Sequence, residues 1–134
     1  MSELLEELAA HPACEIVRKA GLDAFLAQHP LALLFFTGDV RARPEGLDVA
    51  VVVRELANGY QDRLRVGIVD RRDESALMTR FGVVVTPAVV YVRAGQPAEL
   101  VARMRDWPVF AQAADRLLAA AAPDASVAGT GGSA

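Results

Sequence analysis

The segment Val83-Val84-Val85-Thr86-Pro87-Ala88-Val89-Val90-Tyr91-Val92-Arg93 decides the fold, because an extended run meets a Thr-Pro step and continues as a long apolar strand. Two further strands are expected upstream, at Leu31–Phe36 and at 64–69. Leu31–Phe36 is continuously apolar, which is typical of a strand covered on both faces of a sheet. The sequence therefore predicts a sheet whose central strands are buried.

Helical patterns separate these strands. The apolar residues from Val49 to Leu56 recur at positions i, i+3, i+4 and i+7, which predicts a helix. Pro44 suits its first turn, and Asn58-Gly59 is expected to end it. The other expected elements are a helix from Ser2 to His11-Pro12, a strand at Cys14–Val17, helices at 21–29 and 72–81, a turn at 94–97, a strand at 99–104, and a helix from Asp106 to about 122.

This order of elements predicts an α/β fold. Strands that alternate with helices pair in parallel through crossovers, whereas the last two strands form a hairpin. We expect one domain over residues 1–122, with a central mixed sheet between two layers of helices and an extra helix at its N-terminus. Residues 123–134 are rich in Gly, Ser and Ala, and we expect them to be a disordered tail.

Composition excludes several classes of function. The 134 residues carry 14 Lys and Arg against 17 Asp and Glu, so the basic excess of a nucleic-acid binder is missing. There is no run of about 20 apolar residues that would cross a membrane, and the acidic N-terminus does not resemble a signal peptide. One cysteine and two histidines predict no disulfide, metal or cofactor. We expect a cytoplasmic protein.

The element order, with Thr86-Pro87 just before a long strand, resembles the thioredoxin fold over residues 14–122. The resemblance implies a three-layer α/β/α sandwich and a cis bond at Pro87. The chain differs from redox thioredoxins in two ways. The segment after Phe36 contains no Cys-x-x-Cys, and Leu34 occupies the expected place of the buried acid that assists thiol chemistry in thioredoxins. Dithiol exchange needs an attacking and a resolving thiol, so this activity is excluded.

Three strings carry a narrower resemblance: RPEGLDVAVV at 43–52 with Gly38-Asp39 before it, RLRVGIV at 63–69 and RMRDW at 103–107. They are similar to the HyaE/HupG/HoxO family of hydrogenase expression/formation proteins, which have a thioredoxin-like fold without active-site cysteines. This resemblance implies a non-enzymatic chaperone for maturation of an uptake nickel–iron hydrogenase. Its expected partner is the small-subunit precursor with its twin-arginine signal peptide, alongside other maturation proteins.

A receptor for such a signal needs carboxylates for the two arginines and an apolar groove for the segment that follows. The fold is expected to form this groove from three loops, Thr37–Pro44, Val85-Thr86-Pro87 and Met104–Trp107. With a cis Pro87, the Thr86 backbone is expected to face outward and pair with a bound peptide strand.

The leading carboxylates for arginine contacts are Asp39, Glu45 and Asp48, although Glu45 and Asp48 equally suit the positive end of a helix dipole. Asp106 is a further partner-binding candidate, and a helix cap is its alternative role. Trp107 beside it is either a peptide-stacking residue or a core aromatic. The rim arginines Arg41, Arg43, Arg103 and Arg105 fit an arginine-rich ligand poorly, and can instead pair with acids elsewhere on the precursor.

Two other functions stay open. One is a redox protein or peroxidase that works through Cys14 alone, although we expect Cys14 to be a small buried residue at the start of a strand. The other is a thioredoxin-like interaction module with an unrelated partner.

Overall fold

The computed structural model describes residues 2–60 and 62–120. The helices are α1 (Glu3–Ala9), α2 (Leu22–Gln28), α3 (Glu45–Tyr60), α4 (Glu74–Phe81) and α5 (Trp107–Ala120), with short 3-10 turns η1 (Lys19–Gly21) and η2 (Arg71–Asp73). The strands are β1 (Cys14–Val17), β2 (Leu31–Phe36), β3 (Arg65–Val69), β4 (Ala88–Arg93) and β5 (Gln96–Ala102).

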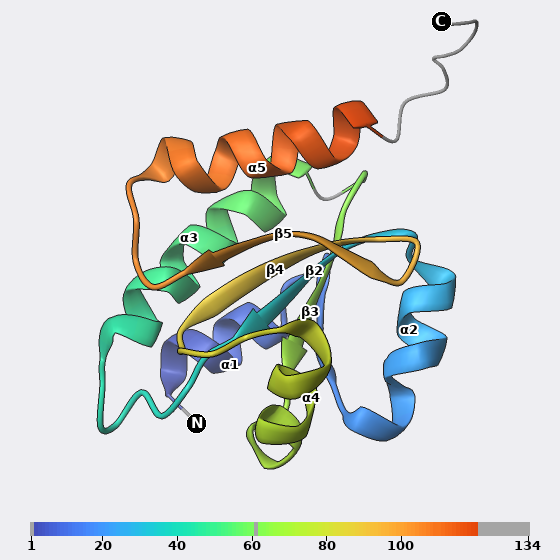
Figure 1. Ribbon diagram of the computed structural model, residues 1–134. Coiled ribbons are helices and arrows are strands. Elements are labelled where there is room, and N and C mark those ends of the chain that lie inside the picture. The colour runs from blue at the N-terminus through green and yellow to red at the C-terminus, as the bar shows by residue number, and fades with distance from the viewer. Residues whose placement is uncertain (1, 61, 121–134) are drawn as a thin grey trace, which may run out of the picture.

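The five strands form one mixed sheet in the order β1-β3-β2-β4-β5 (Figure 1). β1 and β2 both pair with β3 in parallel, whereas β4 runs antiparallel to β2 and to β5. The helical crossovers between β1, β2 and β3 make these strands parallel, and the tight hairpin makes β4 and β5 antiparallel. β4 is also antiparallel to β2, although a helix, α4, precedes it. The predicted α/β fold with a central mixed sheet is confirmed.

Two hydrophobic clusters cover the two faces of the sheet. α1, α3 and α5 pack on one face, where Leu33, Phe35 and Tyr91 are buried. α2 and α4 pack on the other face, against Leu34 and Phe36. Both sets of side chains alternate along the same strands, which is why β2 is apolar at every position.

Several element boundaries differ from the prediction. β5 begins at Gln96 rather than at 99, because Ala94 and Gly95 alone make the turn at positive φ and Arg93 pairs directly with Gln96. Pro97 is tolerated in β5 because β5 is an edge strand and its pairing with β4 is irregular here, with a register shift between Tyr91 and Val92.

α3 continues past Asn58-Gly59 to Tyr60. The Asn58 side chain lies 2.7 Å from His11 Nε2, and the Tyr60 hydroxyl donates to Asp115 of α5, so both residues join the helix to its neighbours instead of ending it. The expected tail at 123–134 and the last two residues of the final helix lie outside the described residues. None of the helices within 2–60 and 62–120 is long and apolar enough to cross a bilayer.

Candidate functional site

Three loops meet at one end of the strands, on the left of Figure 1: the β2–α3 loop, the α4–β4 loop and the β5–α5 loop. Thr86-Pro87, in the second loop, is cis as predicted. The Pro87 carbonyl accepts a hydrogen bond of 2.7 Å from the Arg103 N–H, which joins the second loop to the third. The three segments that the sequence predicted to form a groove are therefore neighbours.

Gly38 brings the first loop into contact with the second. Its φ is +72°, and a Cβ at this position would stand 2.4 Å from Thr86 Oγ1 and 2.8 Å from Thr86 Cβ. Gly46 is equally crowded, because its Cβ would stand 2.6 Å from the Thr37 carbonyl oxygen. Only glycine fits at both points, so the loop that carries the cysteines in a redox thioredoxin is closely packed here.

A buried acid, which the sequence did not single out, holds the Gly38 bend. Glu74 is 2% exposed, and its carboxylate accepts hydrogen bonds from the Gly38 N–H (3.1 Å) and from Arg71 Nη1. In the sequence Glu74 is one of several acids near a helix start, a common solvated position. Only the tertiary structure reveals its burial.

The third loop is attached to α3 through Glu45. Arg103 Nε and Nη2 donate to the Glu45 carboxylate at 2.7–3.1 Å, and the Met104 N–H donates to it at 2.6 Å. The hydrogen bond from Arg103 lowers the pKa of Glu45 below its usual value. Arg103 itself has a φ of +69°, a left-handed conformation that is uncommon for a residue with a side chain.

This pairing assigns a role to one of the rim arginines. Arg103 binds an acid of its own chain, and Glu45 is not an open acceptor for a guest arginine in this conformation. The Arg105 Nε also bonds internally, to the Ala102 carbonyl at 3.1 Å.

The other predicted carboxylates are exposed. Asp39 Oδ1 accepts hydrogen bonds from the N–H groups of Arg41 (3.0 Å) and Ala42 (3.3 Å), so this exposed carboxylate shapes the loop. Asp48 lies in the first turn of α3, and Asp106 directly precedes α5. These three carboxylates surround the loops and are accessible to a cationic partner.

Exposed apolar side chains lie on the second and third loops and on the start of α5. We call this set the apolar rim: Val84, Val85, Met104, Trp107 and Val109, which are between 40% and 85% exposed. Trp107 is therefore half-exposed and not a core residue. An exposed group of large apolar side chains is typical of a protein-binding surface.

Thr86 differs from the prediction, because it is only 7% exposed and its side chain lies against Gly38. Within the described residues, no hydrogen bond engages its backbone N–H or carbonyl. The Thr86 backbone is thus unpaired but shielded, rather than openly presented.

A cleft of about 660 Å³ adjoins the β2–α3 loop at the carboxyl ends of the parallel strands. Its apolar lining comes from Leu5, Ile16, Val40 and Ile68. Arg41, in the β2–α3 loop, also lines this cleft. Ligands of open α/β sheets bind at this edge, beyond the carboxyl ends of the strands.

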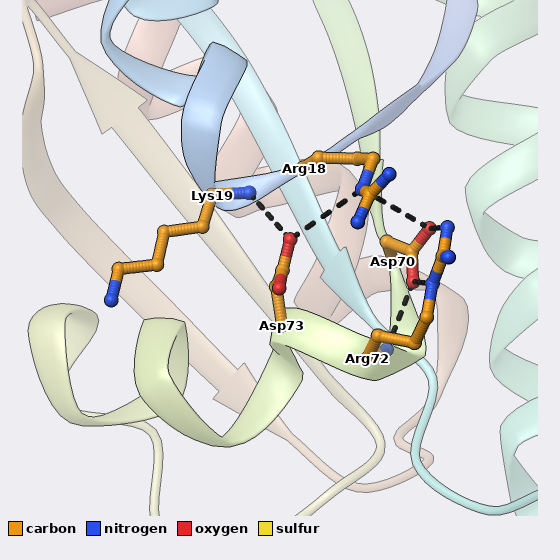
Figure 2. Close-up of polar contacts among 5 residues, drawn as sticks. All are labelled: Arg18, Lys19, Asp70, Arg72 and Asp73. Atoms are coloured by element: carbon orange, nitrogen blue, oxygen red, sulfur yellow. Dashed lines mark hydrogen bonds and ion pairs between the residues drawn. The ribbon is translucent and has the colours of Figure 1, made fainter.

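A network of charges ties the strand ends beside the cleft (Figure 2). Asp73 accepts from the Lys19 backbone N–H at 2.8 Å, and Arg18 lies between Asp70 and Asp73, 3.9 and 3.7 Å from them. Arg72 donates to both oxygens of Asp70 and lowers the pKa of Asp70 to about 2. These contacts connect the end of β1 to the end of β3.

Cys14 is 5% exposed on β1, and burial raises the pKa of its thiol to about 11. A nucleophilic cysteine needs an accessible thiolate, so this environment disfavours the single-cysteine redox function. Cys14 is also the first residue of β1, at the opposite end of that strand from the cleft.

Known proteins resemble the chain in sequence. The profile of the family described as "Hydrogenase-1 expression protein HyaE" matches residues 4–110. The hydrogenase expression/formation protein HupG of Rhizobium leguminosarum bv. viciae is 40% identical over 115 residues, which cover 83% of this chain and 77% of that protein. The hydrogenase expression/formation protein HoxO of Cupriavidus necator is 33% identical over 118 residues, or 87% of this chain and 73% of that protein.

Solved structures support the fold. A thioredoxin variant from Halobacterium salinarum superposes with a TM-score of 0.69 at 21% identity, covering 82% of this chain and 95% of that one. A structure described as hydrogenase expression/formation protein HupG from Rhodopseudomonas palustris has a TM-score of 0.54 at 35% identity, covering 78% and 95%. The thioredoxin-like fold predicted from the sequence is confirmed.

Proposed function

Because the chain belongs to the HyaE family of hydrogenase expression proteins, we propose that it is a non-enzymatic chaperone in hydrogenase maturation. In this proposal it binds the small-subunit precursor of a nickel–iron hydrogenase through the twin-arginine signal peptide. Binding takes place in the cytoplasm, before export, and other maturation proteins act with it.

The observation that carries the proposal is the apolar rim beside exposed carboxylates. A twin-arginine signal presents two guanidinium groups followed by an apolar segment. Met104 and Trp107 offer half-exposed apolar surface to that segment, and the cleft beside the β2–α3 loop adds further apolar lining. Asp39 and Asp48 supply exposed carboxylates for the arginines.

Glu45 has a different role in this proposal from the one expected from its sequence. Since Arg103 and Met104 already occupy its carboxylate, Glu45 fixes the position of the β5–α5 loop and hence of the rim. Asp106 contributes charge at the same loop. Peptide pairing to the Thr86 and Pro87 backbone is secondary to contacts with the rim side chains, because Thr86 is buried.

The test measures binding of the purified chain to the hydrogenase small-subunit precursor of the same organism, by co-purification and by fluorescence anisotropy with its labelled signal peptide. Trp107→Ala is expected to weaken peptide binding at least about 10-fold, since buried aromatic anchors dominate such interfaces. Asp39→Asn and Asp48→Asn are expected to weaken it and to reduce its salt dependence.

Two matched controls lie away from the loops. Leu100→Ala removes an apolar side chain of β5 that is 38% exposed, close to the 40% of Met104, and Asp23→Asn removes an exposed carboxylate of α2. Both are expected to bind as the wild type does. If deletion of the signal peptide leaves precursor binding intact, or if the controls weaken binding as much as the rim variants, the proposed site is wrong.

A further inference from the structure

A second cavity, of about 660 Å³, lies at the opposite edge of the sheet from the three loops. It is formed where β2 and β3 begin and β4 ends, beside the end of α2, on the right of Figure 1. Pro30, Leu31 and Leu64 form its apolar part. Its volume is in the range of small-ligand sites, about 300–1,000 Å³.

The polar lining of this cavity is mainly cationic. The lining includes three arginines, Arg63, Arg65 and Arg93, together with His29 and one acid, Asp62. Arg65 is already engaged, because it donates to Glu15 at 2.6 and 2.9 Å and to the Pro12 carbonyl. Arg63 lies over the Tyr60 ring, 5.1 Å from its centroid.

Arg93 differs from these neighbours. Its Nε is buried and has no hydrogen-bond partner, the one such side-chain atom among the described residues. A buried donor without an acceptor is rare in folded proteins and costs free energy, the more so on a permanently charged guanidinium. Because this Nε is shielded from solvent, an acceptor from outside the chain reaches it only after the Arg93 side chain turns, and that contact would remove the cost.

The backbone fixes Arg93 at this position. Arg93 pairs with Leu31 of β2 on one side and with Gln96 of β5 on the other. The N–H of the next residue, Ala94, donates to the Pro30 carbonyl at 2.8 Å, which attaches the hairpin to the α2–β2 loop. The backbone of Arg93 therefore occupies a rigid sheet position beside the cavity and does not lie in a mobile loop.

We propose that this cavity binds an oxyanion, a carboxylate or a phosphate group, with Arg93 as its principal donor. The planar guanidinium fork matches the paired oxygens of both groups. Its Nε–H lacks an acceptor and is shielded from solvent, so binding requires the Arg93 side chain to turn toward the anion. Glu15 offsets Arg65 and Asp62 offsets one further arginine, so the three arginines still leave a net positive charge at the cavity. The proposal is independent of the peptide groove, which lies at the other end of the same strands.

The test follows the arginine Nε–H resonances of the full chain by ¹⁵N NMR while inorganic phosphate or N-acetylglutamate is added at constant ionic strength. Either anion is expected to shift the Arg93 Nε–H resonance in a saturable way, and the two titrations show which oxyanion is preferred. Arg93→Gln is expected to weaken binding at least about 10-fold, in line with a charge-assisted hydrogen bond. Arg93→Lys, which keeps the charge but lacks the fork, is expected to bind less tightly than the wild type.

The matched control is Arg116→Gln, which removes a surface arginine paired with Glu99 and should leave anion binding unchanged. If Arg93→Gln does not fold, Arg93→Lys decides the question. The proposal is overturned if neither anion shifts the Arg93 resonance, if sodium chloride alone produces the same shift, or if both Arg93 variants bind as tightly as the wild type.

Discussion

The contact between Gly38 and Thr86 can be isolated by a matched pair of glycine substitutions. Gly38 and Gly82 have nearly the same left-handed φ, +72° and +73°, but a Cβ at Gly82 would meet nothing within 4 Å. Gly82→Ala therefore changes the backbone preference alone. Gly38→Ala adds a steric clash with Thr86. The close approach of Gly38 to Thr86 is the contact that brings the β2–α3 loop against the α4–β4 loop.

The expected magnitudes follow from these distances. Placing Ala at a left-handed φ costs about 1 kcal/mol, and this cost applies to both variants. In Gly38→Ala the new Cβ also lies 2.4 Å from Thr86 Oγ1 and 2.8 Å from Thr86 Cβ, well inside normal contact. Overpacking of this kind costs a further 1–3 kcal/mol or so, which gives a total of about 2–4 kcal/mol for Gly38→Ala.

Urea denaturation followed by circular dichroism measures both values. In a thermal scan, each kcal/mol is expected to lower Tm by about 4 °C in a chain of this size. Thr86→Ala in the Gly38→Ala background removes the 2.4 Å contact but keeps the 2.8 Å one, so it should restore part of the loss. Equal destabilisation by Gly38→Ala and Gly82→Ala would refute the close approach of the two loops.

Three further predictions concern the core and the strand ends. Tyr91→Phe leaves the Phe110 carbonyl without its buried 2.8 Å hydrogen bond, and is expected to lower the free energy of unfolding by about 1–2 kcal/mol in urea titrations; an unchanged midpoint would contradict this. Asp70 has a pKa of about 2 in the folded chain against 3.8 ordinarily, so its stabilisation is present above pH 4 and is lost as the pH falls toward 2. Asp70→Asn should therefore make the free energy of unfolding depend less on pH below pH 4. If the variant loses stability with falling pH as steeply as the wild type does, Asp70 is not the cause. Cys14, with a pKa of about 11 instead of 9.0, is expected to react with iodoacetamide at pH 8 at least about 100-fold more slowly in the native chain than in urea, as mass spectrometry can measure.

The sequence was most informative where one local signal decided the structure. The bounds of β2 were predicted residue for residue, because it is a continuous apolar run that begins directly after Pro30. β4 likewise begins directly after Pro87, where the sequence predicted a long apolar strand. Gly82 ends α4 in the left-handed conformation, as a glycine at that position indicates. The resemblance to thioredoxins added the cis bond at Pro87, which no local propensity would have predicted.

The side-chain partners of the candidate site were not predictable in this way. Glu45 and Arg103 are 58 residues apart, and their pairing depends on the loop after β5 reaching the start of α3. From the sequence alone, Glu45 was interpreted as a carboxylate for an arginine of a bound peptide. Arg103 was interpreted as a positive charge that fits an arginine-rich peptide poorly. The buried position of Glu74 and the unpartnered Nε of Arg93 likewise depend on packing between distant segments.

These contacts explain how a thioredoxin-like chain without redox cysteines can keep the three loops in fixed contact. In the β2–α3 loop, glycines at 38 and 46 allow direct packing on Thr86 and Thr37, and the Glu74 carboxylate fixes the Gly38 N–H. Glu45 then attaches the β5–α5 loop to the same helix start. Recognition of an extended peptide benefits from a surface that is rigid before binding, because less conformational entropy is lost on association. Gly38, Gly46, Glu45 and Glu74 therefore order the three loops. In the proposed function, the apolar rim that these loops present is the surface that the partner binds.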